Sequence, residues 1–182
     1  DCYADADGDG YASMDGTTVV SADFDCDDIG EAGVTVPATD CDDSDPLVNP
    51  GAAETAGDEL DLNCDGAEIC LADADGDGFA ATGGATVTSD DTDCTDPGEA
   101  RIGDATGDCD DSNPDIHPGA EDIVADGLDG DCDGYETCYM DGDGDGVPAV
   151  GSLTMLSDDA DCDDFGEAVA SDVYDCNDAE PT

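Results

Sequence analysis

The stretch CYADADGDGY (residues 2–11) places Asp5, Asp7 and Asp9 at alternate positions and follows them with Gly10. Alternating aspartates in a tight loop direct their carboxylates to one centre, and glycine lets the backbone wrap that centre, as in an EF-hand calcium loop. An EF-hand also needs a bidentate Glu at its twelfth position, and Gly16 stands there. The stretch therefore predicts half of a metal-binding loop, whose closing carboxylate comes from elsewhere in the chain.

The composition of the whole chain supports this interpretation. Its 182 residues carry a formal net charge of −52, with 53 Asp and Glu against a single Lys or Arg. Val, Ile, Leu and Phe make up about 14% of the residues, below the roughly 20% at which a highly charged chain is expected to stay disordered. Folding thus requires disulfides, multivalent cations or high salt. Because the acid is mostly Asp placed beside Gly and Cys, metal loops are favoured over salt adaptation.

Charge and residue types exclude several classes of function. A chain this acidic does not neutralise phosphate, which excludes nucleic acid as a partner, and anionic membrane surfaces are disfavoured likewise. No apolar run is long enough for direct membrane insertion. No constellation of His, Lys or Ser accompanies the carboxylates, so we do not expect an enzyme.

The eleven cysteines predict disulfides and an oxidising, extracellular or cell-surface location. No CxxC pair occurs, and most cysteines are flanked by Asp. Neighbouring carboxylates raise a thiol pKa, which makes a poor nucleophile and a poor zinc ligand.

A 68-residue repeat organises the chain. CYADADGDGY begins at Cys2, CLADADGDGF at Cys70 and CYMDGDGDGV at Cys138. We therefore divide the chain into repeat one (1–69), repeat two (70–137) and an incomplete repeat three (138–182). This organisation predicts a section of a longer tandem array, or a subunit whose ends meet other subunits.

Each repeat has the same internal order. The acidic loop is followed by a β-prone run (17–21, 85–89, 153–157), a first acidic knot (23–28, 91–96, 159–164) and a GEA turn. The repeat continues with a second acidic knot (40–43, 108–111) and an NPGA or HPGA segment, which we expect to form a turn or one helical turn. It ends with a closing half-motif (58–66, 126–134). The predicted fold class is mostly irregular with small β elements: tandem calcium- and disulfide-stapled repeats of 68 residues forming an extended rod.

The segments DCDDSDPLVNPGAAETAGDELDLNCDG (40–66) and DCDDSNPDIHPGAEDIVADGLDGDCDG (108–134) resemble the MopE-type metal-binding repeat of bacterial and archaeal surface proteins. The DxDxDG element is more loosely similar to thrombospondin type 3 repeats. The resemblance implies a secreted, calcium-loaded tandem module in adhesive, stalk or surface-layer settings. The copper site of the founding member uses a His and a modified Trp, and it does not carry over, because this chain has no Trp and one His. We interpret that residue, His117, as a turn residue. Glu59 departs from the pattern, where Gly is usual.

The expected ligands form two centres per repeat, with roughly two to four Ca²⁺ per repeat and hence several per chain. The first centre uses the acidic loops, with one backbone carbonyl each: Asp5, Asp7, Asp9 and Tyr11; Asp73, Asp75, Asp77 and Phe79; Asp141, Asp143, Asp145 and Val147. Its closing carboxylates are expected from the first knot, above all Asp25 or Asp28 and their equivalents: Asp23, Asp25, Asp28, Asp91, Asp93, Asp96, Asp159, Asp161 and Asp164. Magnesium suits fewer ligands, and zinc prefers His or thiolate.

The second centre combines the second knot with the closing half-motif. Its expected ligands are Asp40, Asp42, Asp43, Asp58, Asp61, Asn63 and Asp65, and in repeat two Asp108, Asp110, Asp111, Asp126, Asp129, Asp131 and Asp133.

Two disulfide pairing schemes are equally consistent with the 68-residue repeat. One pairs Cys26 with Cys41 and Cys64 with Cys70; the other pairs Cys2 with Cys26 and Cys41 with Cys64. Shorter loops slightly favour the first, which places these cysteines in disulfides: Cys26, Cys41, Cys64, Cys70, Cys94, Cys109, Cys132, Cys138, Cys162 and Cys176.

The resulting prediction is a structural calcium-binding protein of the cell exterior, such as a stalk, adhesin or filament, whose partner is itself. The alternatives are a secreted calcium buffer or metal scavenger, and a calcium module of a larger secreted enzyme. In-phase repetition favours the structural role, because a buffer needs no fixed spacing.

Overall fold

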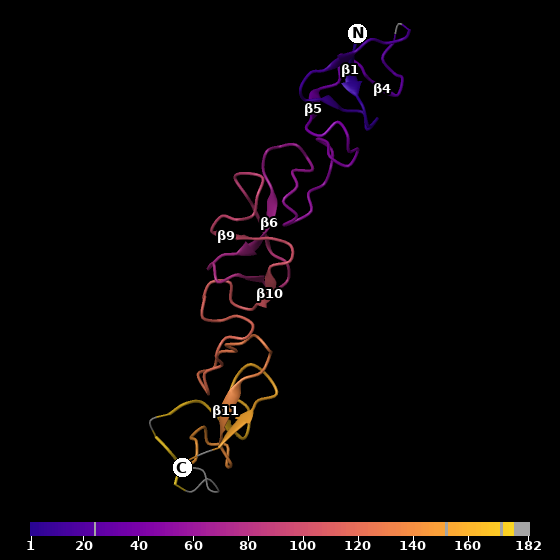
Figure 1. Ribbon diagram of the computed structural model, residues 1–182. Coiled ribbons are helices and arrows are strands. Elements are labelled where there is room, and N and C mark those ends of the chain that lie inside the picture. The colour runs from indigo at the N-terminus through magenta and orange to yellow at the C-terminus, as the bar shows by residue number, and fades with distance from the viewer. Residues whose placement is uncertain (24, 152, 172, 177–182) are drawn as a thin grey trace. The chain divides into compact units, whose positions relative to one another are not determined.

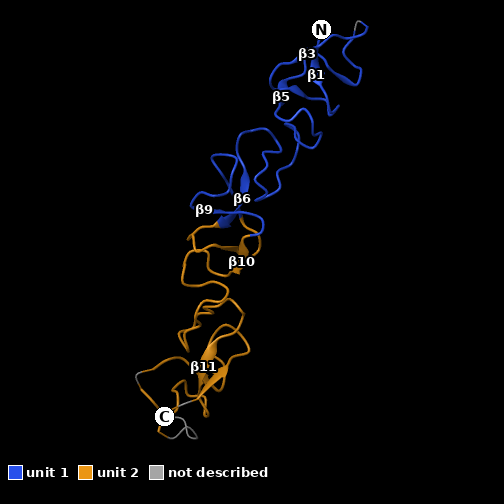
Figure 2. Cartoon of the chain, in the orientation of Figure 1, with its two compact units in different colours: residues 1–72, 86–103 blue, residues 73–85, 104–182 orange. Residues whose placement is uncertain are grey.

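The computed structural model describes residues 1–23, 25–151, 153–171 and 173–176 (Figure 1). The described residues contain short β-strands joined by long irregular segments, and no helix. The chain forms two compact units, residues 1–72 with 86–103 and residues 73–85 with 104–182 (Figure 2). The predicted class, small irregular β structure in disulfide-stapled repeats, is confirmed. Throughout the described part of the chain, no helix is long and apolar enough to span a membrane.

The first unit contains two similar three-stranded sheets. In one, β1 (Cys2–Asp5) lies between β3 (Thr18–Val19) and β4 (Gly30–Ala32), antiparallel to both. In the other, β6 (Ile69–Asp73) lies between β8 (Thr86–Thr88) and β9 (Gly98–Ala100). A small parallel pair joins β2 (Ala12–Ser13) to β5 (Ala38–Asp40). The β-prone runs of repeats one and two thus form β3 and β8, as predicted.

The second unit repeats these two arrangements. β7 (Phe79–Ala81) pairs in parallel with β10 (Ala105–Asp108). β11 (Thr137–Met140) lies between β12 (Thr154–Leu156) and β13 (Glu167–Ala168), antiparallel to both. The third β-prone run therefore forms β12.

The GEA segments are strands rather than the predicted turns. In repeat one, Ala4 lies opposite Glu31 and Asp5 opposite Gly30, so β4 forms the second edge of the sheet. Gly30 has a φ of 90°, which lets the chain leave the first knot and enter the strand. The NPGA and HPGA segments do form turns, closed by Ala52 N to Asn49 O (2.8 Å) and Ala120 N to His117 O (3.0 Å).

The disulfides follow the scheme that loop length did not favour. The pairs are Cys2–Cys26, Cys41–Cys64, Cys70–Cys94, Cys109–Cys132 and Cys138–Cys162. The preference for Cys26–Cys41 and Cys64–Cys70 was wrong, because loop-closure entropy grows only slowly with length and strand pairing decides which cysteines meet. Cys2, left out of the predicted set, is paired, whereas Cys176 forms no disulfide within the described residues.

The interior consists of small residues and carboxylates instead of large apolar side chains. The buried apolar residues are mainly Ala and Cys, while Val20, Ile29 and Phe165 are 85%, 98% and 82% exposed. The largest fully buried side chains are led by acidic residues: Glu68, Glu136, Asp40, Asp108 and Asp141. Apolar burial is therefore not the main stabilising term, and compensation of buried negative charge becomes the central question.

Candidate metal centres

The acidic loop at residues 5–10 is held in shape by its own aspartates. The Asp5 carboxylate accepts hydrogen bonds from Gly8 N (2.7 Å) and Gly10 N (3.2 Å). Asp7 accepts one from Asp9 N (3.2 Å), and Asp9 accepts one from Tyr11 N (2.8 Å). Carboxylate oxygens of the three aspartates lie within 4.8 Å of one another. The local sequence thus gathers three acids at one point, as predicted.

The second acidic knot supplies the distant carboxylates of this loop. Asp43 accepts a hydrogen bond from Ala6 N (2.8 Å), and oxygens of Asp7, Asp40 and Asp43 lie within 4.8 Å of one another. The parallel β2–β5 pair, which sets Ser13 opposite Asp40, brings this knot to the loop. Asp25, one of the expected donors, instead groups with its neighbours in the first knot. Carboxylates from a distant segment therefore do reach the loop, but they come from the second knot, whereas the sequence indicated Asp25 or Asp28.

Repeat two shows the same arrangement and repeat three shares its loop part, and we call these groups the loop centres. In repeat two, Asp73 accepts from Gly76 N (2.8 Å) and Gly78 N (3.2 Å), while Asp111 accepts from Ala74 N (2.8 Å). In repeat three, Asp141 accepts from Gly144 N (2.8 Å) and Gly146 N (2.7 Å). Shared groupings and mutual charge interactions define the three loop centres, which comprise Asp5, Asp7, Asp9, Asp40 and Asp43; Asp73, Asp75, Asp77, Asp108 and Asp111; and Asp141, Asp143, Asp145 and Asp175. Tyr11, Phe79 and Val147 donate their amides to the last loop aspartate, and ligation by their carbonyls remains a prediction.

The closing half-motif forms a second metal-type loop. Asp61 accepts from Asp65 N (3.1 Å) and Gly66 N (3.0 Å), which resembles the way Asp5 holds its loop, although the first donor is four positions on instead of three. Asn63 also accepts from Asp65 N (2.9 Å). In repeat two, Asp129 accepts from Asp133 N (3.1 Å) and Gly134 N (2.9 Å). Cys64 and Cys132 stand inside these loops in left-handed backbone conformations, where the disulfides fix them.

Two buried glutamates face the second loops. Glu68 is completely buried, and neither of its carboxylate oxygens has a hydrogen-bond partner among the described residues. Burial raises its pKa to about 7, with further contributions from the charges of Glu54, Asp58 and Asp61. Glu136 is equally buried, and its pKa is also raised to about 7, first by burial and then by the nearby carboxylates. We call each buried glutamate and the acidic group around it a glutamate centre. The two glutamate centres are Glu54, Asp58, Asp61, Asn63, Asp65 and Glu68 in repeat one, and Asp122, Asp126, Asp129, Asp131, Asp133 and Glu136 in repeat two.

The second knot does not join the glutamate centre as predicted. Asp40 and Asp43 lie at the loop centre, and Asp42 holds a turn by accepting from Ser44 Oγ (2.6 Å). Asp110 does the same with Ser112 Oγ (2.6 Å). The two predicted halves of this centre are therefore divided between two different centres.

The glutamates were missed by the sequence interpretation, although a signal was present. Of nine Glu, five stand at two positions that repeat with the 68-residue step: Glu31, Glu99 and Glu167, and Glu68 and Glu136. In a chain that uses Asp almost everywhere, a Glu that recurs in phase is the signal that could have singled these residues out.

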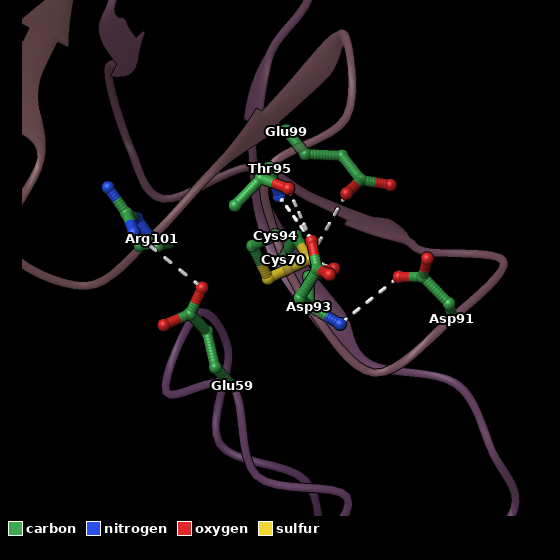
Figure 3. A network of polar contacts seen from close by, with 8 residues as sticks. All are labelled: Glu59, Cys70, Asp91, Asp93, Cys94, Thr95, Glu99 and Arg101. Atoms are coloured by element: carbon green, nitrogen blue, oxygen red, sulfur yellow. Dashed lines mark hydrogen bonds and ion pairs between the residues drawn. A yellow bond between two sulfur atoms is a disulfide. The ribbon is translucent and has the colours of Figure 1, made fainter.

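The loop centres and glutamate centres fit an oxygen-binding cation. Buried oxygens of Asp7, Asp9 and Asp40 lack a hydrogen-bond partner within the described ranges, as do those of Asp75, Asp77 and Asp108. The pKa values of Asp7, Asp40, Asp75 and Asp108 are raised, mainly by burial and further by neighbouring carboxylates. Arg101 is the only Lys or Arg in the sequence. Its Nη1 lies 3.8 Å from Oε1 of the exposed Glu59 (Figure 3). The protein's own cations are thus too few to compensate these buried acids.

The donor set is one that hard divalent cations prefer. The groups assembled are carboxylates and one amide, without thiolate or imidazole. Ten of the eleven cysteines are in disulfides. The His117 ring stacks on Phe79 with centroids 4.6 Å apart, which supports a packing role for this residue.

Two segments of the chain, residues 40–68 and 108–136, match the protein-family model Cu-binding_MopE, which is described as "Putative metal-binding motif". Each match ends on the buried glutamate of a glutamate centre. No curated protein and no solved structure matches the chain.

Proposed function

We propose that this chain, which carries two copies of the MopE-type motif, is a structural extracellular calcium-binding protein whose repeats are stabilised by calcium and disulfides. The observation that carries the proposal is the burial of Glu68 and Glu136 among other carboxylates, in a chain with 53 acids and one Lys or Arg. An uncompensated buried charge costs several kcal/mol, so bound cations offset the term that most opposes folding.

Calcium fits these centres better than other biological cations. It takes six to eight oxygens in flexible geometry, which suits clusters of four to six side chains drawn from separate loops. Magnesium requires a stricter octahedron, and zinc or copper prefers imidazole or sulfur.

The position of the centres supports a structural role. Asp43, 37 residues beyond Ala6, contacts the loop that it closes, so an ion held there ties distant parts of a repeat together. The five disulfides favour an oxidising, extracellular location. The partner that suits such a module is another copy of itself, in a stalk, adhesin or filament. We propose no catalytic role, no nucleic-acid partner and no direct insertion into membranes.

Electron microscopy of the purified, oxidised chain tests the assembly role. We expect end-to-end assemblies in calcium that dissociate in EGTA. Monodisperse particles that bind calcium without assembling would favour a soluble calcium buffer instead.

A further inference from the structure

The first acidic knots form clusters of their own, outside the residues matched by the family model. In repeat one, carboxylate oxygens of Asp23, Asp25 and Asp28 lie within 4.8 Å of one another. A serine precedes each knot, and its hydroxyl bonds to the first knot aspartate: Ser21 to Asp23 (3.0 Å), Ser89 to Asp91 (3.3 Å) and Ser157 to Asp159 (3.2 Å). The same curled segment is thus present in each repeat.

A glutamate from the GEA strand lies beside each knot: its amide donates to the carbonyl of the last knot aspartate, and its side chain is buried in repeat three and half-buried in repeats one and two. Glu167 is 8% exposed, and its Oε2 has no hydrogen-bond partner in the part of the chain that the structure describes. It lines a cavity of about 490 Å³ together with Asp164 of the knot and Cys162. In repeat one, Oε2 of Glu31 is likewise buried and lacks a partner among the described residues. An orphaned carboxylate oxygen beside an acidic cluster is the situation that a cation resolves.

The disulfide of each sheet sets the distance between knot and glutamate. In repeat two, Glu99 Oε2 lies 3.7 Å from Cys70 Sγ, and Asp93 O lies 3.6 Å from the same sulfur (Figure 3). A disulfide sulfur carries no proton, so neither contact is a hydrogen bond, and the glutamate gains no donor from it. In repeats one and three the matching carbonyls, of Asp25 and Asp161, lie 3.3 and 3.4 Å from the sulfur.

We propose that each repeat holds a third cation site, formed by the first knot and the glutamate of the GEA strand beside the disulfide. Its side chains are Asp23, Asp25, Asp28 and Glu31; Asp91, Asp93, Asp96 and Glu99; and Asp159, Asp161, Asp164 and Glu167. The cation is of the same hard divalent class as in the proposed function, on which the choice of calcium rests. Asp27 is not needed, because Thr95 replaces it in repeat two.

The third sites bind more weakly than the loop centres. The knot aspartates are exposed, whereas Asp40 and Asp108 of the loop centres are 1% exposed. Exposed carboxylates attract a cation through a high dielectric medium, so their interaction energy is smaller. Calcium is therefore expected to leave the knots first as its concentration falls.

The test counts calcium ions on the full oxidised chain by native mass spectrometry during a calcium titration. The variant D25N/D93N/D161N changes one exposed aspartate per knot to a residue that keeps an acceptor oxygen, and E31Q/E99Q/E167Q changes the opposing group. Asp90→Asn, an exposed acid that lies between Ser89 and Asp91 and corresponds to Ala22 of repeat one, is the control for loss of a single exposed charge beside a knot. We expect each triple variant to lose the three weakest ions while D90N keeps them. Unchanged ion counts in both triple variants would overturn the third site and leave the proposed function standing. A wild-type chain without calcium would overturn both.

Discussion

The substitution Glu68→Gln tests the glutamate centre most sharply, because it removes a charge with little change in shape. Glu68 is fully buried with both oxygens unpartnered among the described residues, and its pKa is raised to about 7 by burial and the neighbouring acids. As a ligand it binds calcium only when deprotonated. We expect the variant to bind one ion about 100-fold more weakly, which removes about 2.7 kcal/mol of calcium-dependent stabilisation at saturation.

The raised pKa adds a proton signature to this prediction. At pH 6 most Glu68 is protonated in the metal-free protein, so calcium binding at this centre releases close to one proton. Apparent affinity at the centre then falls about tenfold between pH 8 and pH 6. Isothermal titration calorimetry in buffers of different ionisation enthalpy measures the release, and E68Q should lack it.

Glu59→Gln is the matched control for this experiment. It removes one exposed glutamate whose contact with Arg101 spans 3.8 Å at the surface, and such pairs contribute about 0–1 kcal/mol. If E68Q binds calcium like E59Q and releases the same number of protons as the wild type, Glu68 is not a ligand, and the reasoning from its burial fails.

Three further predictions concern pH, the loop centres and the disulfides. Folding raises the pKa of Glu68 and Glu136 from 4.5 to about 7, so the metal-free protein loses stability as pH rises through this window. Its melting temperature should therefore be higher at pH 5 than at pH 8, whereas the calcium-loaded protein should melt at a higher temperature at pH 8 than at pH 5. Asp40→Asn should weaken one calcium ion about 10- to 100-fold in a calorimetric titration, whereas Asp42→Asn, which changes a turn residue, should not; equal effects would reject the corrected donor. Mass spectrometry of a non-reduced digest should find Cys41 linked to Cys64, and replacing both by Ser should cost about 3 kcal/mol in urea unfolding; a Cys26–Cys41 peptide would contradict the fold.

Features encoded within a few residues could be predicted from the sequence. The DxDxDG loops, the β-prone runs and the NPGA and HPGA turns depend on local spacing, and the structure forms each of them where the sequence indicates. Their repetition every 68 residues made the interpretation secure, since each motif occurs in the same relation to its neighbours.

Features that depend on which distant segments meet could not be predicted in this way. The parallel pairing of β2 with β5 involves strands of two and three residues, too short to leave a sequence pattern, yet it decides that Asp40 approaches Asp7. The disulfide pairs and the position of Glu68 follow from the same long-range arrangement. Acidic composition indicated an oxygen donor set, whereas strand pairing decides which carboxylates come together.

The most direct test of the account is metal analysis of the purified, oxidised chain, combined with thermal melts followed by circular dichroism in calcium and in EGTA. The account predicts several calcium ions per chain, and a large fall in melting temperature and in protease resistance when calcium is removed with the disulfides intact. A chelated, oxidised sample that keeps the melting temperature of the calcium-loaded protein would contradict the claim that bound cations replace the missing core.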